Sequence, residues 1–148
     1  MTSSDHELIL LITRTTLQIR AAVQRALADY GMQRPWNLVL DALAAEDGLT
    51  PGQIAKHLQV SGPTAVKMAQ RMESKGLVER RRDDPDGRLV RVYLTPRGRE
   101  VQPSVRGAVD RVSEQAAAGL TTKDRAAVSR ALTKMRANLG AEHLDLEA

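Results

Sequence analysis

Residues 50–76 decide the fold, and they read TPGQIAKHLQVSGPTAVKMAQRMESKG. Thr50 can cap a helix that begins at Pro51, because proline suits the first helical position. Gln53 can complete a capping box with Thr50, in which each side chain binds the backbone N–H of the other residue. We therefore expect a short helix that ends near Leu58.

A second helix follows at once in the same stretch. Ser61 is a favoured N-cap residue, and the helix that it opens is expected to cover residues 62–75. Gly76 can close this helix, because glycine readily adopts the positive φ that is common just after a helix. Two short helices joined by a turn of three or four residues predict a helix-turn-helix, a DNA-binding motif.

The second of these helices has two chemically different faces. The apolar face is expected to pack inward and contains Ala65, Met68, Ala69 and Met72. The opposite face contains Pro63, Thr64, Lys67, Gln70, Arg71 and Ser74. On that face Lys67 and Arg71 can reach phosphates or guanine, and Thr64 can contact a base or a thymine methyl. The alternative is a face that is merely solvated.

A strand-like segment, a turn and a second strand-like segment come next, at residues 77–82, 83–87 and 88–94. The turn is dense in Asp, Pro and Gly, and the last segment is rich in β-branched and aromatic residues. These features predict a β-hairpin. Because two strands alone are only marginally stable, the hairpin should pack against the helices.

Short motifs extend beyond the helix-turn-helix itself. They are GLT at residues 48–50, IAKHL at 54–58, VSGPTAV at 60–66, GLVER at 76–80 and DGRLVRVYLT at 86–95. The last has the form Asp-x-Arg-x-x-x-Val-x-Leu-Thr and is much more specific than a helix-turn-helix alone. Over about residues 36–100 these motifs resemble the MarR family of bacterial regulators, which the outer helices match only in position and length.

The resemblance implies a mainly α fold with a small β-hairpin wing (α+β), that is, a winged helix-turn-helix with N- and C-terminal dimerisation helices. The whole chain, residues 1–148, is then a single MarR-like domain. Its DNA-binding lobe covers about residues 36–99. Its helical dimerisation region covers about residues 4–30 and 96–146.

The resemblance also gives roles to two residues near the hairpin tip. In the family a wing arginine enters the minor groove, and an aspartate two residues earlier steadies it. These roles fall on Arg88 and Asp86. A narrow minor groove has an enhanced negative potential that favours an inserted arginine. The alternative is an ordinary exposed ion pair, which contributes little free energy.

Positive charge is concentrated in the same region. Residues 50–99 hold eleven Lys and Arg against five Asp and Glu, whereas the rest of the chain holds eleven against thirteen. The arginines at residues 80–82, with Arg91, can follow phosphates, and Ser61 can meet one at a helix N-terminus. The residues predicted to contact DNA are Ser61, Pro63, Thr64, Lys67, Gln70, Arg71, Arg82, Asp86, Arg88 and Arg91.

The N-terminal part predicts a long helix over about residues 4–30. Ser4 and Glu7 can form a capping box at its start, and Gly31 can close it. One apolar stripe contains Leu8, Ile12, Thr15, Ile19, Val23, Ala26 and Tyr30, and Leu10, Leu17 and Ala21 form part of a second. A long helix with two apolar faces needs more than one partner, and a subunit interface would supply one.

The C-terminal part predicts two more helices, one opened by Thr95 and one by a capping box of Thr121 and Asp124. Pro103 predicts a kink or a late start in the first. The second carries Val128, Leu132, Met135 and Leu139 at heptad-like spacing. We expect a homodimer that reads half-sites about one helical turn, ~10 bp, apart. Packing within one chain is the alternative.

The resemblance further implies an effector, because many members of the family bind small aromatic acids between the dimerisation helices and the DNA-binding lobe. Arg14 lies on the stripe of Leu10 and Leu17 and could clamp a carboxylate through two hydrogen bonds. Trp36 could form an apolar wall for a ring. The alternatives are an interface salt bridge for Arg14 and a plain core position for Trp36.

The sequence also excludes several classes of protein. The chain has no cysteine, which excludes disulfides, thiol nucleophiles and thiolate metal sites. Its longest apolar run, residues 8–12, is too short to span a membrane, and its polar N-terminus does not resemble a signal peptide, so we expect a cytoplasmic protein. We find no nucleophile motif, phosphate-binding glycine loop or metal-ligand spacing, and expect neither a cofactor nor enzymatic activity.

The sequence therefore predicts a dimeric regulator of double-stranded operator DNA, more often a repressor than an activator in this family. A small aromatic carboxylate or phenol would release it from the operator. The alternative is a constitutive DNA-binding or architectural module without an effector. A titration of phenolic acids against operator binding would separate the two.

Overall fold

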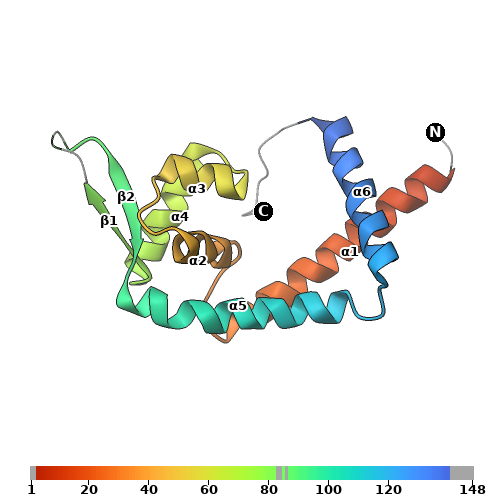
Figure 1. Ribbon diagram of the computed structural model, residues 1–148, viewed down its shortest axis with the longest axis horizontal. Coiled ribbons are helices and arrows are strands. Elements are labelled where there is room, and N and C mark those ends of the chain that lie inside the picture. The colour runs from red at the N-terminus through yellow and green to blue at the C-terminus, as the bar shows by residue number, and fades with distance from the viewer. Residues whose placement is uncertain (1–2, 83–84, 86, 141–148) are drawn as a thin grey trace.

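The chain forms six helices and one β-hairpin in a computed structural model, which describes residues 3–82, 85 and 87–140. In chain order these elements are α1 (Ser3–Ala28), α2 (Trp36–Ala45), α3 (Pro51–Leu58), α4 (Gly62–Ser74), β1 (Val78–Arg82), β2 (Val90–Leu94), α5 (Pro96–Ala116) and α6 (Thr122–Leu139). Figure 1 shows α2, α3, α4 and the hairpin gathered at one end, with α5 leading away from them toward α6. The predicted fold class is confirmed.

Capping side chains begin four of the helices where the sequence predicted. Thr50 Oγ1 accepts a hydrogen bond from the Gln53 backbone N–H at 3.2 Å, and Gln53 Oε1 accepts one from the Thr50 N–H at 2.8 Å. Ser61, Thr95 and Thr121 likewise accept a hydrogen bond from the backbone N–H three residues on, at the starts of α4, α5 and α6. Local sequence alone therefore positions the helix-turn-helix along the chain.

One predicted helix start is wrong, and one of the two alternatives predicted for Pro103 is excluded. α1 begins at Ser3, so Ser4 lies inside the first turn and is not the N-cap. No Gly or Pro precedes Ser4, so nothing in the sequence stops the helix from extending backward. α5 begins at Pro96 and continues through Pro103, so it does not start late. The Thr95 cap holds its first turn, and Pro103 removes only one backbone hydrogen bond further along.

α1, α3 and α4 are each followed by a residue with left-handed backbone. These residues are Gly31, Gln59 and Gly76, with φ of 65°, 57° and 73°. In each case the N–H of the next residue donates to the carbonyl five positions back, as in the bond of 3.0 Å from Val60 to Ala55. The two glycines were predicted, but Gln59 was not, because this conformation is strained for a residue with a side chain. Burial of Val60 in the core holds the turn in place.

The core lies where α2, α3, α4, α5 and β2 meet. Its fully buried large side chains are all aliphatic or methionine: Leu27, Leu40, Leu43, Ile54, Met68, Met72, Val39, Val60, Val78, Val92 and Val105. Trp36 is the one buried aromatic residue in the part of the chain that the structure describes. Such a core depends on close packing of small groups, so single added or lost methyl groups are costly.

The hairpin, called the wing below, is antiparallel and shorter than predicted. Its register places Val78 opposite Leu94 and Arg82 opposite Val90. Arg88 was predicted to begin the second strand. Because Arg82 pairs with Val90, Arg88 instead lies in the connection between the strands, at the tip of the hairpin. The wing also pairs with the α2–α3 connection: the Gly48 N–H donates to the Val92 carbonyl at 3.1 Å, and the Val92 N–H donates to the Leu49 carbonyl at 2.8 Å.

α1 and α6 keep large apolar side chains exposed. Leu11 and Leu17 of α1 are 64% and 58% exposed, and Leu132 of α6 is 41% exposed. Along the whole of α6, which the structure describes in full, no residue is buried. These two helices therefore present apolar faces that the chain itself does not cover. None of the helices described is both long enough and apolar enough to cross a membrane.

The first turn of α5 passes very close to the start of β1 at Gly98, and this close approach generates a testable prediction. A Cβ added at Gly98 would lie 2.0 Å from the Leu77 carbonyl oxygen and 3.3 Å from Leu94 Cδ2. Because the oxygen belongs to the backbone, it cannot move aside cheaply. We expect Gly98→Ala to lower the free energy of unfolding by about 3 kcal/mol, the upper range for overpacking, as measured by urea denaturation.

Gly107 provides the matched control on the same helix. A Cβ there would meet only Arg111 Nη1, at 3.6 Å. Gly107→Ala should therefore stabilise the protein by roughly 0.5–1 kcal/mol through helix propensity. Equal effects of the two substitutions would contradict the close approach at Gly98.

Candidate nucleic-acid interface

α4 presents the two faces that its sequence predicted. Ala65, Met68, Ala69 and Met72 are buried. Pro63, Lys67, Gln70, Arg71 and Ser74 are exposed, and Thr64 is partly buried. The exposed face thus carries two long cations and one amide on a rigid helix, held from below by four packed side chains. Such a surface can offer both charge and hydrogen bonds to the major groove of DNA.

The hydroxyls of Ser61 and Thr64 are joined at the start of α4. Ser61 Oγ accepts a hydrogen bond from the Thr64 backbone N–H at 3.2 Å and donates one to Thr64 Oγ1 at 2.9 Å. The single hydroxyl proton of Ser61 is therefore engaged, and a phosphate would have to compete for it. Thr64 keeps its own hydroxyl proton, which leaves it a donor.

The base of the wing is joined to the end of α4 by one carboxylate. Glu73 Oε2 accepts the Arg80 backbone N–H at 2.8 Å, and Glu73 Oε1 accepts the Arg80 Nε–H at 3.0 Å. The backbone hydrogen bond, with the guanidinium beside it, lowers the pKa of Glu73 below its ordinary value. This contact fixes the direction in which the wing leaves α4.

Two arginines, Arg81 and Arg91, lie directly opposite each other on the outer face of the wing. Like charges in this position repel, but each side chain has another partner. Arg81 pairs with Glu79 and lies over the Tyr93 ring, 4.5 Å from its centroid. Arg91 Nη1 donates to the Gly48 carbonyl at 2.9 Å. Arg91, predicted to contact DNA, thus also links the wing to the α2–α3 connection.

The tip of the wing holds two more of the predicted residues. Arg82 Nη1 donates to the Gly87 carbonyl at 3.0 Å, so this guanidinium bridges the tip next to Arg88. Arg88 itself is exposed. Asp86, predicted to orient Arg88, lies outside the described residues.

Asp47 joins three elements and was not singled out from the sequence. Its Oδ1 accepts the Leu94 N–H of the wing at 2.9 Å and the Gly48 N–H at 3.2 Å. Its Oδ2 accepts a hydrogen bond from Arg99 Nη2 of α5 at 2.7 Å. The only sequence signal is an Asp-Gly pair, which is common in turns and does not reveal partners about fifty residues away.

The two residues predicted to bind an effector differ in their exposure to solvent. Arg14 is exposed on α1. Trp36 is 2% exposed and belongs to the core cluster. The structure therefore places Trp36 where a ring could reach it only through a change in packing.

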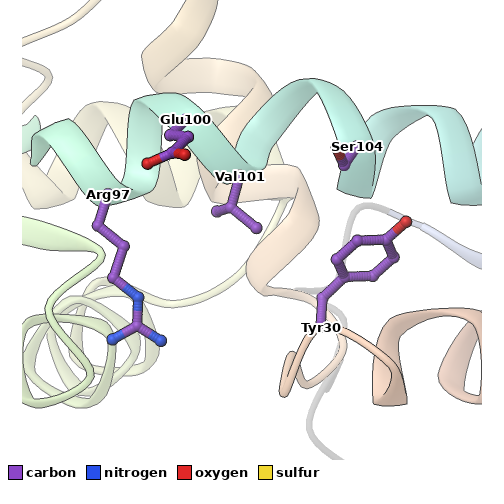
Figure 2. Close-up of a pocket in the computed structure, with 5 residues that line it drawn as sticks. All are labelled: Tyr30, Arg97, Glu100, Val101 and Ser104. Atoms are coloured by element: carbon purple, nitrogen blue, oxygen red, sulfur yellow. The ribbon is translucent and has the colours of Figure 1, made fainter.

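A hollow of about 320 Å³ lies elsewhere, between the end of α1 and the first half of α5. It is lined by Tyr30, Arg97, Glu100, Val101 and Ser104, and Figure 2 shows the Tyr30 ring turned toward α5. Arg97 Nη1 donates to the Lys75 carbonyl just after α4, at 2.9 Å. One wall of this hollow is thus attached to the helix with the basic face, which the sequence did not suggest.

Comparison with known proteins agrees with this arrangement. Residues 30–89 match the family described as "MarR family". The transcriptional regulator TtmR of Methylorubrum extorquens is 30% identical over 141 residues, which cover 94% of this chain and 70% of that protein. A transcriptional repressor of Mycobacterium tuberculosis is 26% identical over 133 residues, which cover 90% of this chain and 96% of the repressor.

Two solved structures are similar over most of the chain. The structure of Staphylococcus aureus MepR with DNA has a TM-score of 0.81 and 26% identity, and covers 88% of this chain and 96% of that one. An organohalide-sensing regulator in its 2,4-dichlorophenol-bound form has a TM-score of 0.82 and 24% identity, and covers 93% of this chain and 82% of that one. The similarity to the organohalide-sensing regulator shows only that the two proteins share a fold. The relatives are transcriptional regulators and not enzymes.

The hydrogen bonds of Asp47 to Leu94, Gly48 and Arg99, called the Asp47 junction below, generate a prediction about which of them stabilises the fold. Asp47→Ala leaves the Leu94 N–H without a partner and should lower the free energy of unfolding by about 2 kcal/mol. Asp47→Asn keeps an oxygen for that N–H and loses an ion pair whose Arg99 partner is 61% exposed. Because exposed pairs contribute little, the Asn variant should lose about 1 kcal/mol or less.

Urea denaturation of both variants measures the difference. Arg99→Ala is the control, because it removes the ion pair alone and should resemble Asp47→Asn. If Asp47→Asn is as damaging as Asp47→Ala, the ion pair and not the backbone hydrogen bond holds the junction.

Proposed function

The chain belongs to the MarR family of transcriptional regulators, and we propose that it acts as a dimeric repressor that a small aromatic acid releases from a pseudo-palindromic operator. The observation that carries the proposal is the exposed face of α4, which contains Lys67, Gln70 and Arg71. The wing lies beside this face, because Glu73 of α4 binds Arg80 of β1. A rigid helix and a wing of fixed direction can enter two neighbouring grooves of DNA. Because bacterial operator DNA lies in the cytoplasm, the protein would work there.

On DNA, the proposed roles follow the chemistry of each side chain. α4 enters the major groove, where Lys67 and Arg71 bind guanine edges or phosphates and Thr64 contacts a base. Arg88 enters the minor groove and reads its width more than its sequence, with Asp86 orienting it. Pro63 and Gln70 make the remaining base contacts, and Ser61, Arg82 and Arg91 contact phosphates.

The dimer would be formed by the helices outside the DNA-binding lobe, about residues 4–30 and 96–146. Support comes from the exposed apolar faces of α1 and α6, which a second copy of the chain would cover. A two-fold axis would then place the two copies of α4 about one helical turn of DNA apart, ~10 bp. The lobe of about residues 36–99 would move with those helices.

An effector would act by stabilising a spacing of the two α4 helices that does not fit the operator. The organohalide-sensing regulator, whose fold this chain shares, was solved with a chlorinated phenol, which supports an aromatic ligand here. Arg14 and Trp36 are the residues that the sequence predicts for it. A constitutive DNA-binding module without an effector is the alternative, favoured if phenolic acids never weaken operator binding.

Arg88→Ala tests the assignment of the wing. It should weaken binding to a labelled duplex from upstream of the protein's own coding region by about 10- to 100-fold. It should also reduce the slope of log affinity against log salt concentration by about the contribution of one phosphate contact. Fluorescence anisotropy at several salt concentrations measures both.

Arg111→Ala is the control for Arg88, because Arg111 is an exposed arginine of α5 away from the wing. It should leave operator affinity within about twofold. Unchanged affinity of Arg88→Ala at moderate salt would contradict the wing assignment, whatever the control does.

The dimer is tested with two leucines of nearly equal exposure. Leu132 of α6 and Leu38 of α2 are 41% and 42% exposed. Sedimentation should give a dimer at micromolar concentration, and Leu132→Glu should shift it to monomer, because a charge in an apolar interface is costly. Leu38→Glu should remain dimeric. A wild-type monomer at that concentration would contradict the half-site arrangement.

A further inference from the structure

Val66 is the one large apolar side chain of α4 that remains exposed, at 37%. α4 lies entirely within the described residues, and its other large apolar side chains, Met68 and Met72, are fully buried. A single exposed valine is ordinary on a protein surface. Val66, however, lies on the helix that the proposed function places in the major groove, and the sequence did not predict that it contacts DNA. What it can contact there depends on its position around the helix.

Helical spacing places Val66 between two exposed, uncharged residues. Pro63 lies three positions before it and Gln70 four positions after it, so the three side chains form an uncharged strip along α4. Glu73, seven positions after Val66, lies on the same side of the helix and binds Arg80 of the wing. The uncharged strip therefore lies on the side of α4 to which the wing is attached.

The cations of α4 lie further around its exposed face. Lys67 directly follows Val66 and Arg71 directly follows Gln70, so each is rotated by about 100° from the uncharged strip. Long cationic side chains can reach phosphates as well as bases. The uncharged strip gains nothing from phosphate charge. Once α4 is in the groove, the strip can contribute binding free energy mainly through contacts with base edges.

Valine is selective among base edges because it has no hydrogen-bonding group. In the major groove guanine, cytosine and adenine present polar atoms, and thymine also presents an apolar group, its C5 methyl. Covering a polar atom with valine methyls removes its water and supplies no partner, which is costly. Covering the thymine methyl instead buries apolar surface. The β-branched side chain has one main rotamer in a helix, so little entropy is lost in fixing it.

We propose that Val66 reads a thymine in each half-site by contact with its C5 methyl, which makes the uncharged strip a reader of A·T pairs. The inference rests on the proposed function and adds the class of base pair that α4 selects. Gln70 lies one helical turn from Val66, about 5.4 Å along the axis, and can bind N6 and N7 of an adenine. Thr64, whose methyl is the other candidate for this contact, lies beyond the cations on the opposite flank of the exposed face.

The experiment first selects duplexes from a random pool with the full-length wild-type protein and then removes thymine methyls one at a time. Replacing thymine with deoxyuridine removes only the C5 methyl and keeps base pairing. At one symmetric position, this replacement should weaken wild-type binding about fourfold in one half-site and about 15-fold in both, as expected for the burial of one methyl each. Fluorescence anisotropy measures the affinities.

Variants of Val66 assign the methyl contact. Val66→Ala should fold normally, because the residue is exposed and alanine is the best helix former. It should bind the thymine and deoxyuridine duplexes within about twofold of each other, since both changes remove the same contact. Val66→Thr keeps the shape but adds a hydroxyl, and should accept cytosine or adenine at that position better than wild type does.

Leu38→Ala is the matched control, because Leu38 is an aliphatic residue of α2 that is 42% exposed. It should keep the wild-type ratio of affinities for the thymine and deoxyuridine duplexes. Thr64→Ser, which removes one methyl group and keeps the hydroxyl, should keep that ratio as well.

The proposal is wrong if no thymine methyl in the selected duplexes affects wild-type binding, or if Val66→Ala keeps the full difference between thymine and deoxyuridine. It is also wrong if Thr64→Ser abolishes that difference, since the contact then belongs to Thr64. Failure of the proposed function looks different. A protein that selects no sequence from the pool is not a sequence-specific regulator, whereas a selected sequence without a Val66-dependent methyl removes only the role of Val66.

Discussion

The orientation of the wing is the constraint on which the DNA-binding surface depends, and the Asp47 and Glu73 carboxylates set it together. A two-stranded hairpin is marginally stable alone, so its direction must come from what it touches. Asp47 binds the Leu94 N–H at one end of β2, and the α2–α3 connection pairs with Val92 in the middle. Glu73 holds the other strand at Arg80. The wing is thereby fixed to both ends of the helix-turn-helix, and the angle between α4 and the wing is set by the protein before any DNA is present.

α5 connects this fixed surface to the outer helices. Its first turn lies against the backbone of Leu77, and its Arg99 reaches Asp47. Further along, α5 packs on α2 and α1, so one rigid element touches the wing, the core and the long N-terminal helix. A change in the packing of α1 can therefore move the wing without local unfolding.

The sequence predicts the parts of this structure that depend on near neighbours. The caps at Thr50 and Ser61 and the closing glycines are local chemistry, and the apolar face of α4 follows from helical spacing. The left-handed Gln59 could not be predicted, because its strain is accepted only to bury Val60. Asp47 could not be predicted either, because its importance lies in distant partners that only the folded chain brings to it.

The arginines of the wing strands show how the fold divides the work of binding DNA. Arg80 and Arg81 face glutamates, which offset their charge as well as fixing their geometry. Arg82 instead donates to the Gly87 carbonyl, a bond that positions its guanidinium and leaves its charge in place. Because attraction to phosphates depends on charge and not on base identity, Arg82 is better suited to phosphate contacts than Arg80 or Arg81. A run of basic residues in sequence is therefore not a uniform basic stripe in the structure. In the proposed complex, specific recognition is assigned to α4, whose exposed side chains project from a helix that four buried side chains hold in the core.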